Sequence, residues 1–456
     1  MHLSSSDCGG AGRACVRLHK SLLNYGIDSI ILTQNKTSDF PQIHRLAQTK
    51  FQKAIEKIRP SLSQLPLSLY PARHSDIFSP QLPFFIPSNK LLLRRIDELK
   101  PDIVHLHWVE SGFINIKDLA KINAPLLWNL HDANPYTGGC HYVAAACIGV
   151  GIGCKKCPLL CSKNPYDISY FSFRRKKNAY NKLNITINGL SRWIAKCAKD
   201  SALFKDKTII NLPNPIDTNA FAPIPKKIAR KLLNITTAQK VIAFGAIDDI
   251  HRKGFSELLS ALKLLKIDYH LIVFGTNSNA SLPNKKTHFL GKLSDDATIR
   301  LAYNSCDVFV VPSLAENLSN AIMEALSCAV PVVAFDIGGN GDMITHKHNG
   351  YLAKDVSDLA RGIEWVLDSA NYQILSQNAR NSVMENFSET KVAKQYILQY
   401  ETIIAKNANR GGVERYKLVI IFAESANLQY ELPRKVIHNN KNKHKLTRNL
   451  HQRFVA

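Results

Sequence analysis

Two glutamates in the second half of the chain, Glu316 and Glu324, have the surroundings of a ligand-binding pair. An apolar run typical of a buried strand ends at Pro312, and a helical pattern begins near Leu318. Eight helical positions span roughly 12 Å, so the two carboxylates cannot serve one atom. Glutamates at this spacing often belong to a solvated helix face. Their place after a buried strand, and before a second strand that ends at Gly338, favours a binding site instead.

A ligand lying across the start of this helix would meet several groups in order. Free backbone N–H groups near Leu318 and Ser319 can bind phosphate, because the first turn of a helix offers them no internal partners. Glu316 would then contact a sugar hydroxyl, and Glu324 would contact a ribose. A sugar attached to a nucleoside diphosphate has its parts in this order.

Two cations, Arg252 and Lys253, precede a helical pattern that starts at Phe255. A departing nucleoside diphosphate gains negative charge in the transition state, so fixed cations beside it would aid the reaction itself. The alternative is that both side chains are simply exposed to solvent.

The first half contributes a glycine turn at Gly9 and Gly10 and a histidine, His131, at the end of an apolar run. Glycines let a ligand approach the backbone at a helix start, and open α/β sheets bind ligands at the carboxyl ends of their strands. Histidine can donate or accept a proton near neutral pH, so His131 could orient a hydroxyl or stabilise a departing oxygen. A buried structural histidine is the alternative, and for His105 and His107 it is our interpretation.

Two series of strand-like apolar runs alternate with helical patterns, which predicts two doubly wound parallel sheets. A linker with four prolines, from Asn211 to Pro225, separates the two series. The first run, Met1 to Leu3, predicts a strand of barely three residues, which leaves open whether the start truncates it. The other predicted strands are 27–32, 103–106, 126–130, 185–187, 241–244, 271–274, 307–311 and 332–335.

The composition is that of an ordinary globular protein with a large positive charge. The 456 residues carry 59 basic and 36 acidic side chains, for a net charge of +23. This balance favours anionic partners, and the basic run 174–177 is either a membrane-binding cluster or a solvated helix face. Scattered tryptophans give no sign of nucleic acid binding, which would place aromatics among basic residues. A polar start and the lack of long apolar runs predict a cytoplasmic protein.

Five of the ten cysteines fall between Cys140 and Cys161. Two close cysteines and two upstream suffice for a closed, tetrahedral and therefore structural zinc site, although the upstream pair lacks the usual close spacing. Reduced thiols in a loop are the alternative. The predicted zinc ligands are Cys140, Cys147, Cys154 and Cys157.

The motifs together resemble the family 4 (group 1) glycosyltransferases, retaining enzymes of the GT-B fold, and most closely their bacterial exopolysaccharide, capsule and O-antigen members. The resemblance spans most of residues 4 to 405 and stops before the tail. It rests on Asp7-x-Gly-Gly, His131-Asp132, Arg252-Lys-Gly254, the E-x7-E pattern from Glu316 to Glu324, and Gly350-Tyr-Leu352.

The resemblance implies a donor site made of Gly9, Gly10, Arg252, Lys253, Glu316, Asn317, Leu318, Ser319 and Glu324. His131, Glu316 and Lys253 would be the catalytic residues, with His131 near the reacting carbon. Many relatives have an arginine after the strand-ending glycine, whereas here Ala246 follows Gly245, so diphosphate binding would depend more on Arg252 and Lys253.

The predicted architecture is an acceptor-side domain at 1–212, a nucleotide-sugar domain at 213–388, a final helix at about 389–405 that packs back onto the first domain, and a poorly ordered basic tail at 406–456. The predicted reaction moves a hexose from a UDP- or GDP-sugar to a lipid-linked or oligosaccharide acceptor, with retention and without a catalytic metal. We expect front-face substitution, at the cytoplasmic side of a membrane. The alternatives are a GT-B-fold epimerase and, in another class, a nucleic-acid-binding protein.

Overall fold

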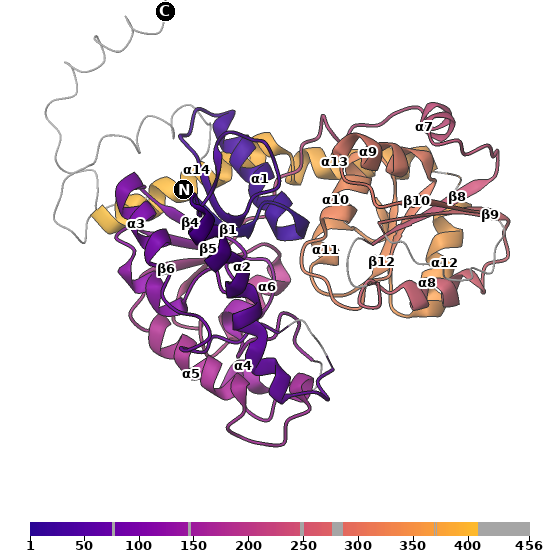
Figure 1. Ribbon diagram of the computed structural model, residues 1–456. Coiled ribbons are helices and arrows are strands. Elements are labelled where there is room, and N and C mark those ends of the chain that lie inside the picture. Colours follow the sequence, from indigo (N-terminus) through magenta and orange to yellow (C-terminus); the bar gives the residue numbers. More distant parts are fainter. Residues whose placement is uncertain are drawn as a thin grey trace, which may run out of the picture. The chain divides into compact units, whose positions relative to one another are not determined.

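The computed structural model describes residues 1–74, 78–144, 147–246, 250–275, 286–368, 370 and 372–408 (Figure 1). Met1–Ile404 form one compact unit, which contains two separate sheets. The predicted tail therefore lies outside the described residues beyond Ala408. The predicted domain boundaries stay a prediction.

The first sheet has seven parallel strands in the order β3-β2-β1-β4-β5-β6-β7. Its strands are β1 (His2–Ser6), β2 (Ile31–Asn35), β3 (Ile43–Arg45), β4 (Val104–Leu106), β5 (Leu126–Leu130), β6 (Ile185–Gly189) and β7 (Thr208–Asn211). Its main helices are α1 (Gly9–Leu23), α2 (Lys50–Gln64), α3 (Lys90–Leu99), α5 (Ile168–Tyr180), α6 (Arg192–Asp200) and, from the end of the described chain, α14 (Glu389–Ala408). Short helices η1 (Leu65–Leu69), η2 (Ile116–Lys121), η3 (Asn134–Tyr136), α4 (Gly149–Ile152) and η4 (Pro158–Leu160) lie in its loops.

The second sheet has six parallel strands in the order β10-β9-β8-β11-β12-β13. They are β8 (Lys240–Gly245), β9 (Tyr269–Phe274), β10 (Thr287–Gly291), β11 (Val308–Val311), β12 (Val332–Phe335) and β13 (Gly350–Ala353). The helices are α7 (Lys226–Leu232), α8 (Phe255–Leu262), α9 (Asp296–Ser305), α10 (Asn320–Ser327), α11 (Asn340–Met343), α12 (Val356–Leu367) and α13 (Tyr372–Asn386).

Alternate residues of β8 show that the second sheet is covered on both faces. Val241 and Ala243 pack in one core with α9, α10 and α13, whereas Ile242 and Phe244 pack in another with α8 and α12. Figure 1 shows these two groups of helices on opposite sides of the sheet. Because both faces are buried, the strands read as continuous apolar runs rather than as alternating ones.

Both sheets confirm the predicted doubly wound α/β class, while several element bounds differ. The first strand, β1, runs over five residues, because the polar residues Ser4 to Ser6 continue it beyond the predicted end at Leu3. The strand predicted from Ile27 begins only at Ile31. Strands β3, β7, β10 and β13 lack the long apolar run by which the others were found, and they lie toward the sheet edges.

The run 174–177 does not form one basic face. Arg175 is half-buried and donates to Asn115 Oδ1 at 2.8 Å, and Lys176 is buried and donates to Asn134 Oδ1 at 2.9 Å. Arg174 and Lys177 alone are exposed. Among the described residues, no helix is both long and apolar enough to cross a bilayer.

Candidate active site

The strand order of each sheet reverses at one place, and the predicted site residues follow the strands that flank it. In the first sheet this switch point lies between β1 and β4, and in the second between β8 and β11. Chains leaving adjacent parallel strands in opposite directions open a crevice there. The glycine turn follows β1, and the loop that carries Glu316 follows β11.

Glycines fix the path of the Glu316 loop. Gly254 has a φ of +75°, and a Cβ atom there would lie 1.7 Å from the Pro312 carbonyl oxygen. Gly338 has a φ of +54°, and its Cβ would lie 1.8 Å from the Glu316 oxygen. The loop is therefore held by backbone packing on two sides, which leaves no room for other residues at these positions.

Glu316 is paired with Lys253, whose Nζ lies 2.6 Å from its Oε2. Burial would raise the pKa of Glu316, but the Lys253 ammonium holds that pKa below its usual range. Arg252 donates to the Ala315 carbonyl at 3.1 Å and lies over the Tyr142 ring. Arg252 and Lys253 are thus half-buried beside the Glu316 loop, so the interpretation as merely exposed cations is wrong.

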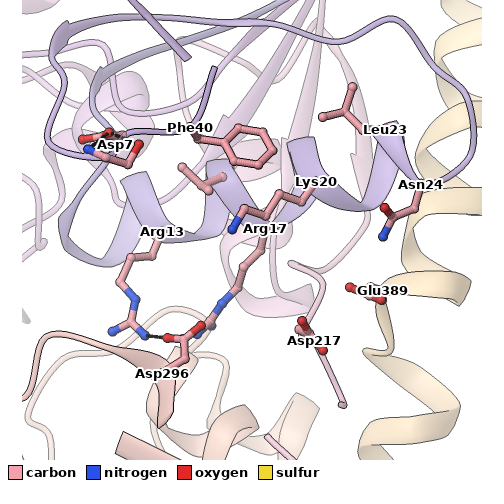
Figure 2. A pocket seen from close by; sticks show the side chains of 12 residues that line it. Asp7, Arg13, Arg17, Lys20, Leu23, Asn24, Phe40, Asp217, Asp296 and Glu389 are labelled. Carbon is pink, nitrogen blue, oxygen red and sulfur yellow. Dashed lines mark hydrogen bonds and ion pairs between the residues drawn. The ribbon is translucent and has the colours of Figure 1, made fainter. Parts of the chain in front are cut away.

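Glu324 is buried on α10 and already carries three contacts. Tyr303 donates to its Oε2 at 2.9 Å, and Arg17 of α1 donates to its Oε1 at 2.6 Å. Arg13 lies 3.6 Å from the same Oε1 and 2.6 Å from Asp296. Figure 2 shows both arginines reaching toward Asp296 in a pocket of about 370 Å³ along α1. Sequence reasoning missed both arginines, because their spacing on α1 alone does not reveal a carboxylate partner 307 residues away.

The residues after Glu316 connect the two switch points. Asn317 donates to the Leu130 carbonyl at 2.9 Å and accepts from Ser191 Oγ at 2.7 Å. Asn320, the first residue of α10, donates to the carbonyl of Gly10 at 3.0 Å. The structure thus brings the glycine turn of the first sheet against the helix start of the second.

Leu318 and Ser319 are buried just before α10, and Ser319 makes no side-chain hydrogen bond to the first turn. The first turn also carries no acidic side chain. This leaves the helix start in the form that binds anions.

A cavity of about 160 Å³ lies at the carboxyl ends of β5 and β11. Glu316 and Asn317 line it from one side, and Asp132 and His141 from the other, with Trp193 beside them. The predicted catalytic residue His131 does not line this cavity, because its imidazole turns toward His107.

Asp132 and His141 form a buried pair, with Oδ2 and Nδ1 2.7 Å apart. Trp108 Nε1 donates to the same Oδ2 at 2.8 Å, and His141 Nε2 lies 2.9 Å from Ser79 Oγ. Burial would raise the pKa of Asp132, but His141 lowers it below its usual range. Burial would lower the pKa of His141, but Asp132 raises it above its usual range. His141, next to the cysteine segment, is a site residue that the sequence did not single out.

His131 ends a row of imidazoles behind the cavity. Its Nε2 lies 3.1 Å from His107 Nδ1, and His107 Nε2 lies 3.1 Å from His2 Nδ1. Burial lowers the pKa of His131 to about 4, against the opposing effect of Asp132. His131 is therefore neutral near pH 7 and can either donate or accept a hydrogen bond.

His2, His105 and His107 have ligand atoms within 4.8 Å of one another, and in the described chain they are the one such group with a metal-binding arrangement. Burial lowers the pKa of His2, and so do His105, the N-terminal ammonium and His19. His105 also bonds Tyr400 at 2.7 Å. These contacts agree with the structural role expected for His105 and His107.

The four predicted zinc ligands lie in one region of the first sheet's loops, and all four are free thiols. Cys140, Cys154 and Cys157 are buried, and Cys154 Sγ accepts from the Gly138 N–H at 3.1 Å. Within the described residues, no three of these sulfurs lie within 4.8 Å of one another. The zinc site stays a prediction.

Known proteins with the same two-sheet fold include sugar-transferring enzymes. A sucrose-phosphate synthase from Thermosynechococcus elongatus superposes with a TM-score of 0.64 at 16% identity, over 89% of this chain and 99% of that one. Anabaena HepE in complex with UDP-glucose superposes with a TM-score of 0.56 at 16% identity, over 90% of this chain and 98% of that one. The fold is the GT-B fold.

Residues 238–369 match the family profile described as "Glycosyl transferases group 1". The chain is 26% identical over 223 residues to the N,N'-diacetylbacillosaminyl-diphospho-undecaprenol alpha-1,3-N-acetylgalactosaminyltransferase of Campylobacter jejuni. That match covers 46% of this chain and 58% of the relative, so the chain spans little more than half the length of this relative. These matches support a group 1 glycosyltransferase, of the family also called family 4, and the profile match covers residues 238–369.

Proposed function

We propose that this protein transfers a hexose from a nucleoside diphosphate sugar to a lipid-linked or oligosaccharide acceptor, with retention of the anomeric configuration, in surface polysaccharide synthesis. The observation that carries the proposal is the Glu316 loop. It places a carboxylate, a lysine paired with it and an uncapped helix start at the switch point of the second sheet.

The proposed donor is a UDP- or GDP-sugar. The diphosphate would bind at the start of α10, near Leu318 and Ser319 and the cations Arg252 and Lys253. Glu324 would hold the ribose, in exchange for part of its present contact with Arg17. Gly9 and Gly10 support this arrangement, because a Cβ at either position would meet nothing within 4 Å, which leaves open space beside α10. The UDP-glucose complex of the structurally similar HepE agrees with a donor of this class.

The proposed acceptor enters from the first sheet, where Asp132 and His141 line the cavity opposite Glu316. A lipid-linked acceptor is suggested by the undecaprenol-linked substrate in the name of the Campylobacter jejuni relative. We place the reaction at the cytoplasmic side of a membrane for this reason. The relatives and structures named above include no epimerase and no nucleic-acid-binding protein.

The proposed reaction is a front-face substitution. The bond between the anomeric carbon and the diphosphate oxygen breaks, and the acceptor hydroxyl bonds to that carbon from the same face. The departing diphosphate takes the hydroxyl proton, so charge and protons balance. Arg252, Lys253 and the N–H groups of α10 would stabilise the charge that develops on the leaving group, so the mechanism needs no metal. His131 stays a proposed catalytic residue, and it would position a hydroxyl near the reacting carbon once its imidazole turns from His107 toward the cavity.

A binding screen with UDP-, GDP-, ADP- and TDP-sugars by thermal shift identifies the donor, since a ligand that binds the folded protein raises its Tm. In a reconstituted assay with that donor, we expect Glu316→Gln and Lys253→Ala each to lower kcat by about 100-fold or more, as loss of a transition-state contact does. The control is Lys196→Ala, which removes an exposed lysine paired with Asp200. Undiminished transfer by both site variants would refute the proposed site, and an inverted product by NMR would refute retention.

A further inference from the structure

Helix α2 presents its apolar side chains to solvent. Phe51 is 75% exposed and Ile58 is 62% exposed, and Ile55 between them is also exposed. The stripe continues through Leu65 and through Leu69, which is 75% exposed, in η1 directly after the helix. The intervals of three and four residues place these side chains along one side of the helix.

The face of α2 that packs against the protein is polar instead. Its buried residues are Glu56, Arg59 and Ser63. Glu56 accepts from the Ala47 N–H at 3.0 Å and from Arg45 at 3.2 Å, and Arg59 donates to the Gly112 carbonyl at 2.6 Å. An ordinary surface helix buries its apolar stripe and exposes its polar one. In α2 this arrangement is inverted, so the apolar stripe is not needed for the core.

The charges around the stripe are of one sign. Lys50, Lys53 and Lys57 are exposed on α2, and the one acidic residue of the helix, Glu56, is turned inward. Lysines beside an exposed apolar stripe are typical of a helix that lies in the interface of a bilayer with anionic lipids. In a contact between two copies, the lysines of one copy would repel those of the other. The segment 410–456, with ten basic against three acidic side chains, also has the wrong charge to cover them.

We propose that α2 and η1 form a docking surface for anionic phospholipid bilayers, in which Phe51, Ile58 and Leu69 insert and the lysines contact the headgroups. This proposal goes beyond the transferase function and does not depend on it. It assigns membrane contact to α2 rather than to the run 174–177, where Lys176 is buried and Arg175 is half-buried.

The test is flotation of the full-length protein with vesicles of phosphatidylglycerol and phosphatidylcholine, compared with vesicles of phosphatidylcholine alone. We expect binding to the anionic vesicles that weakens as salt is raised, because Lys contacts are screened. Phe51→Asn/Ile58→Asn should lower the partition coefficient by about tenfold or more, since two apolar insertions are lost. The matched control is Ile228→Asn/Leu232→Asn on the lysine-bearing helix α7, where the side chains are 51% and 63% exposed, and it should bind as the wild type does.

A second measurement follows insertion directly. The emission of Phe51→Trp should shift to shorter wavelength on adding anionic vesicles. Folded wild-type protein that stays unbound would overturn the proposal, as would equal binding by the two double variants. A concentration-dependent dimer in light scattering that the α2 variant alone abolishes, with flotation unchanged, would assign the stripe to a second copy instead.

Discussion

The two sheets of this protein differ in the polarity of the side chains on their buried faces. Both faces of the second sheet are apolar, as the alternating side chains of β8 show. In the first sheet one face is apolar, while the other carries a polar seam, which consists of the buried His2, His105, His107, Asn129 and Asn188 and the half-buried His131. The seam continues into α14, because Tyr396 bonds Asn129 and Asn188 and Tyr400 bonds His105.

The two sheets therefore position their site residues in different ways. At the second sheet, the apolar layers hold a loop and a helix whose charged groups are paired at the edge, Glu316 with Lys253 and Glu324 with Arg17. At the first sheet, hydrogen bonds between uncharged imidazoles lead to His131. Fixed charges suit an anionic leaving group, whereas neutral hydrogen-bonding groups suit a hydroxyl.

The largest expected effect comes from breaking the backbone packing at the second sheet. Gly338→Ala places a Cβ 1.8 Å from the Glu316 oxygen at a φ of +54°. We expect a loss of about 3 kcal/mol in the free energy of unfolding, because strain and overpacking add. Urea unfolding measures it. Gly10→Ala, whose Cβ meets nothing within 4 Å, is the control and should change stability by less than about 1 kcal/mol. Equal losses in both variants would contradict the packing argument.

A somewhat smaller loss of stability is expected at the first sheet. There Asp132 and His141 form the one buried ion pair of the described cavity lining. The raised pKa of His141 means that its stabilisation is fully present below pH 6.5, its unfolded-state value, and is lost as pH rises through the higher folded value. His141→Gln should therefore cost about 2 kcal/mol near pH 6 and clearly less near pH 9. Urea unfolding at both pH values tests this. His270→Gln, which removes a histidine whose pKa burial lowers, should show no such decline.

The smallest effect concerns the row of neutral imidazoles formed by His131, His107 and His2. His107→Asn removes a hydrogen bond to His131 and should cost about 1 kcal/mol of stability and lower kcat by a few-fold, because His107 positions His131 without touching substrate. Since the pKa of His131 is about 4, transfer by the wild type should show no inflection from this histidine between pH 5.5 and 8. A wild-type pH profile with an inflection near 6.5 that His131→Asn abolishes would show that His131 titrates in the active range.

Much of the second sheet could be predicted because its signals are local. The strand before Pro312, the helix near Leu318 and the pair Glu316 and Glu324 lie within one stretch of chain, so their order along a ligand follows from helix geometry. The first sheet gave weaker signals. β1 looked too short because the polar residues Ser4 to Ser6 continue it beyond Leu3. His141 was missed because its partner Asp132 is recognised only when the loop folds back.

The sequence by itself determined the α/β class, the two series of strands and the glycine and glutamate positions at their ends, because burial and turns leave periodic, local marks. The tertiary structure alone decided that Arg17 reaches Glu324, that Lys253 faces Glu316 and that α2 turns its apolar stripe outward. Periodicity tells which residues share a face of an element. It does not tell what that face will meet, because the partners come from segments far apart in the chain.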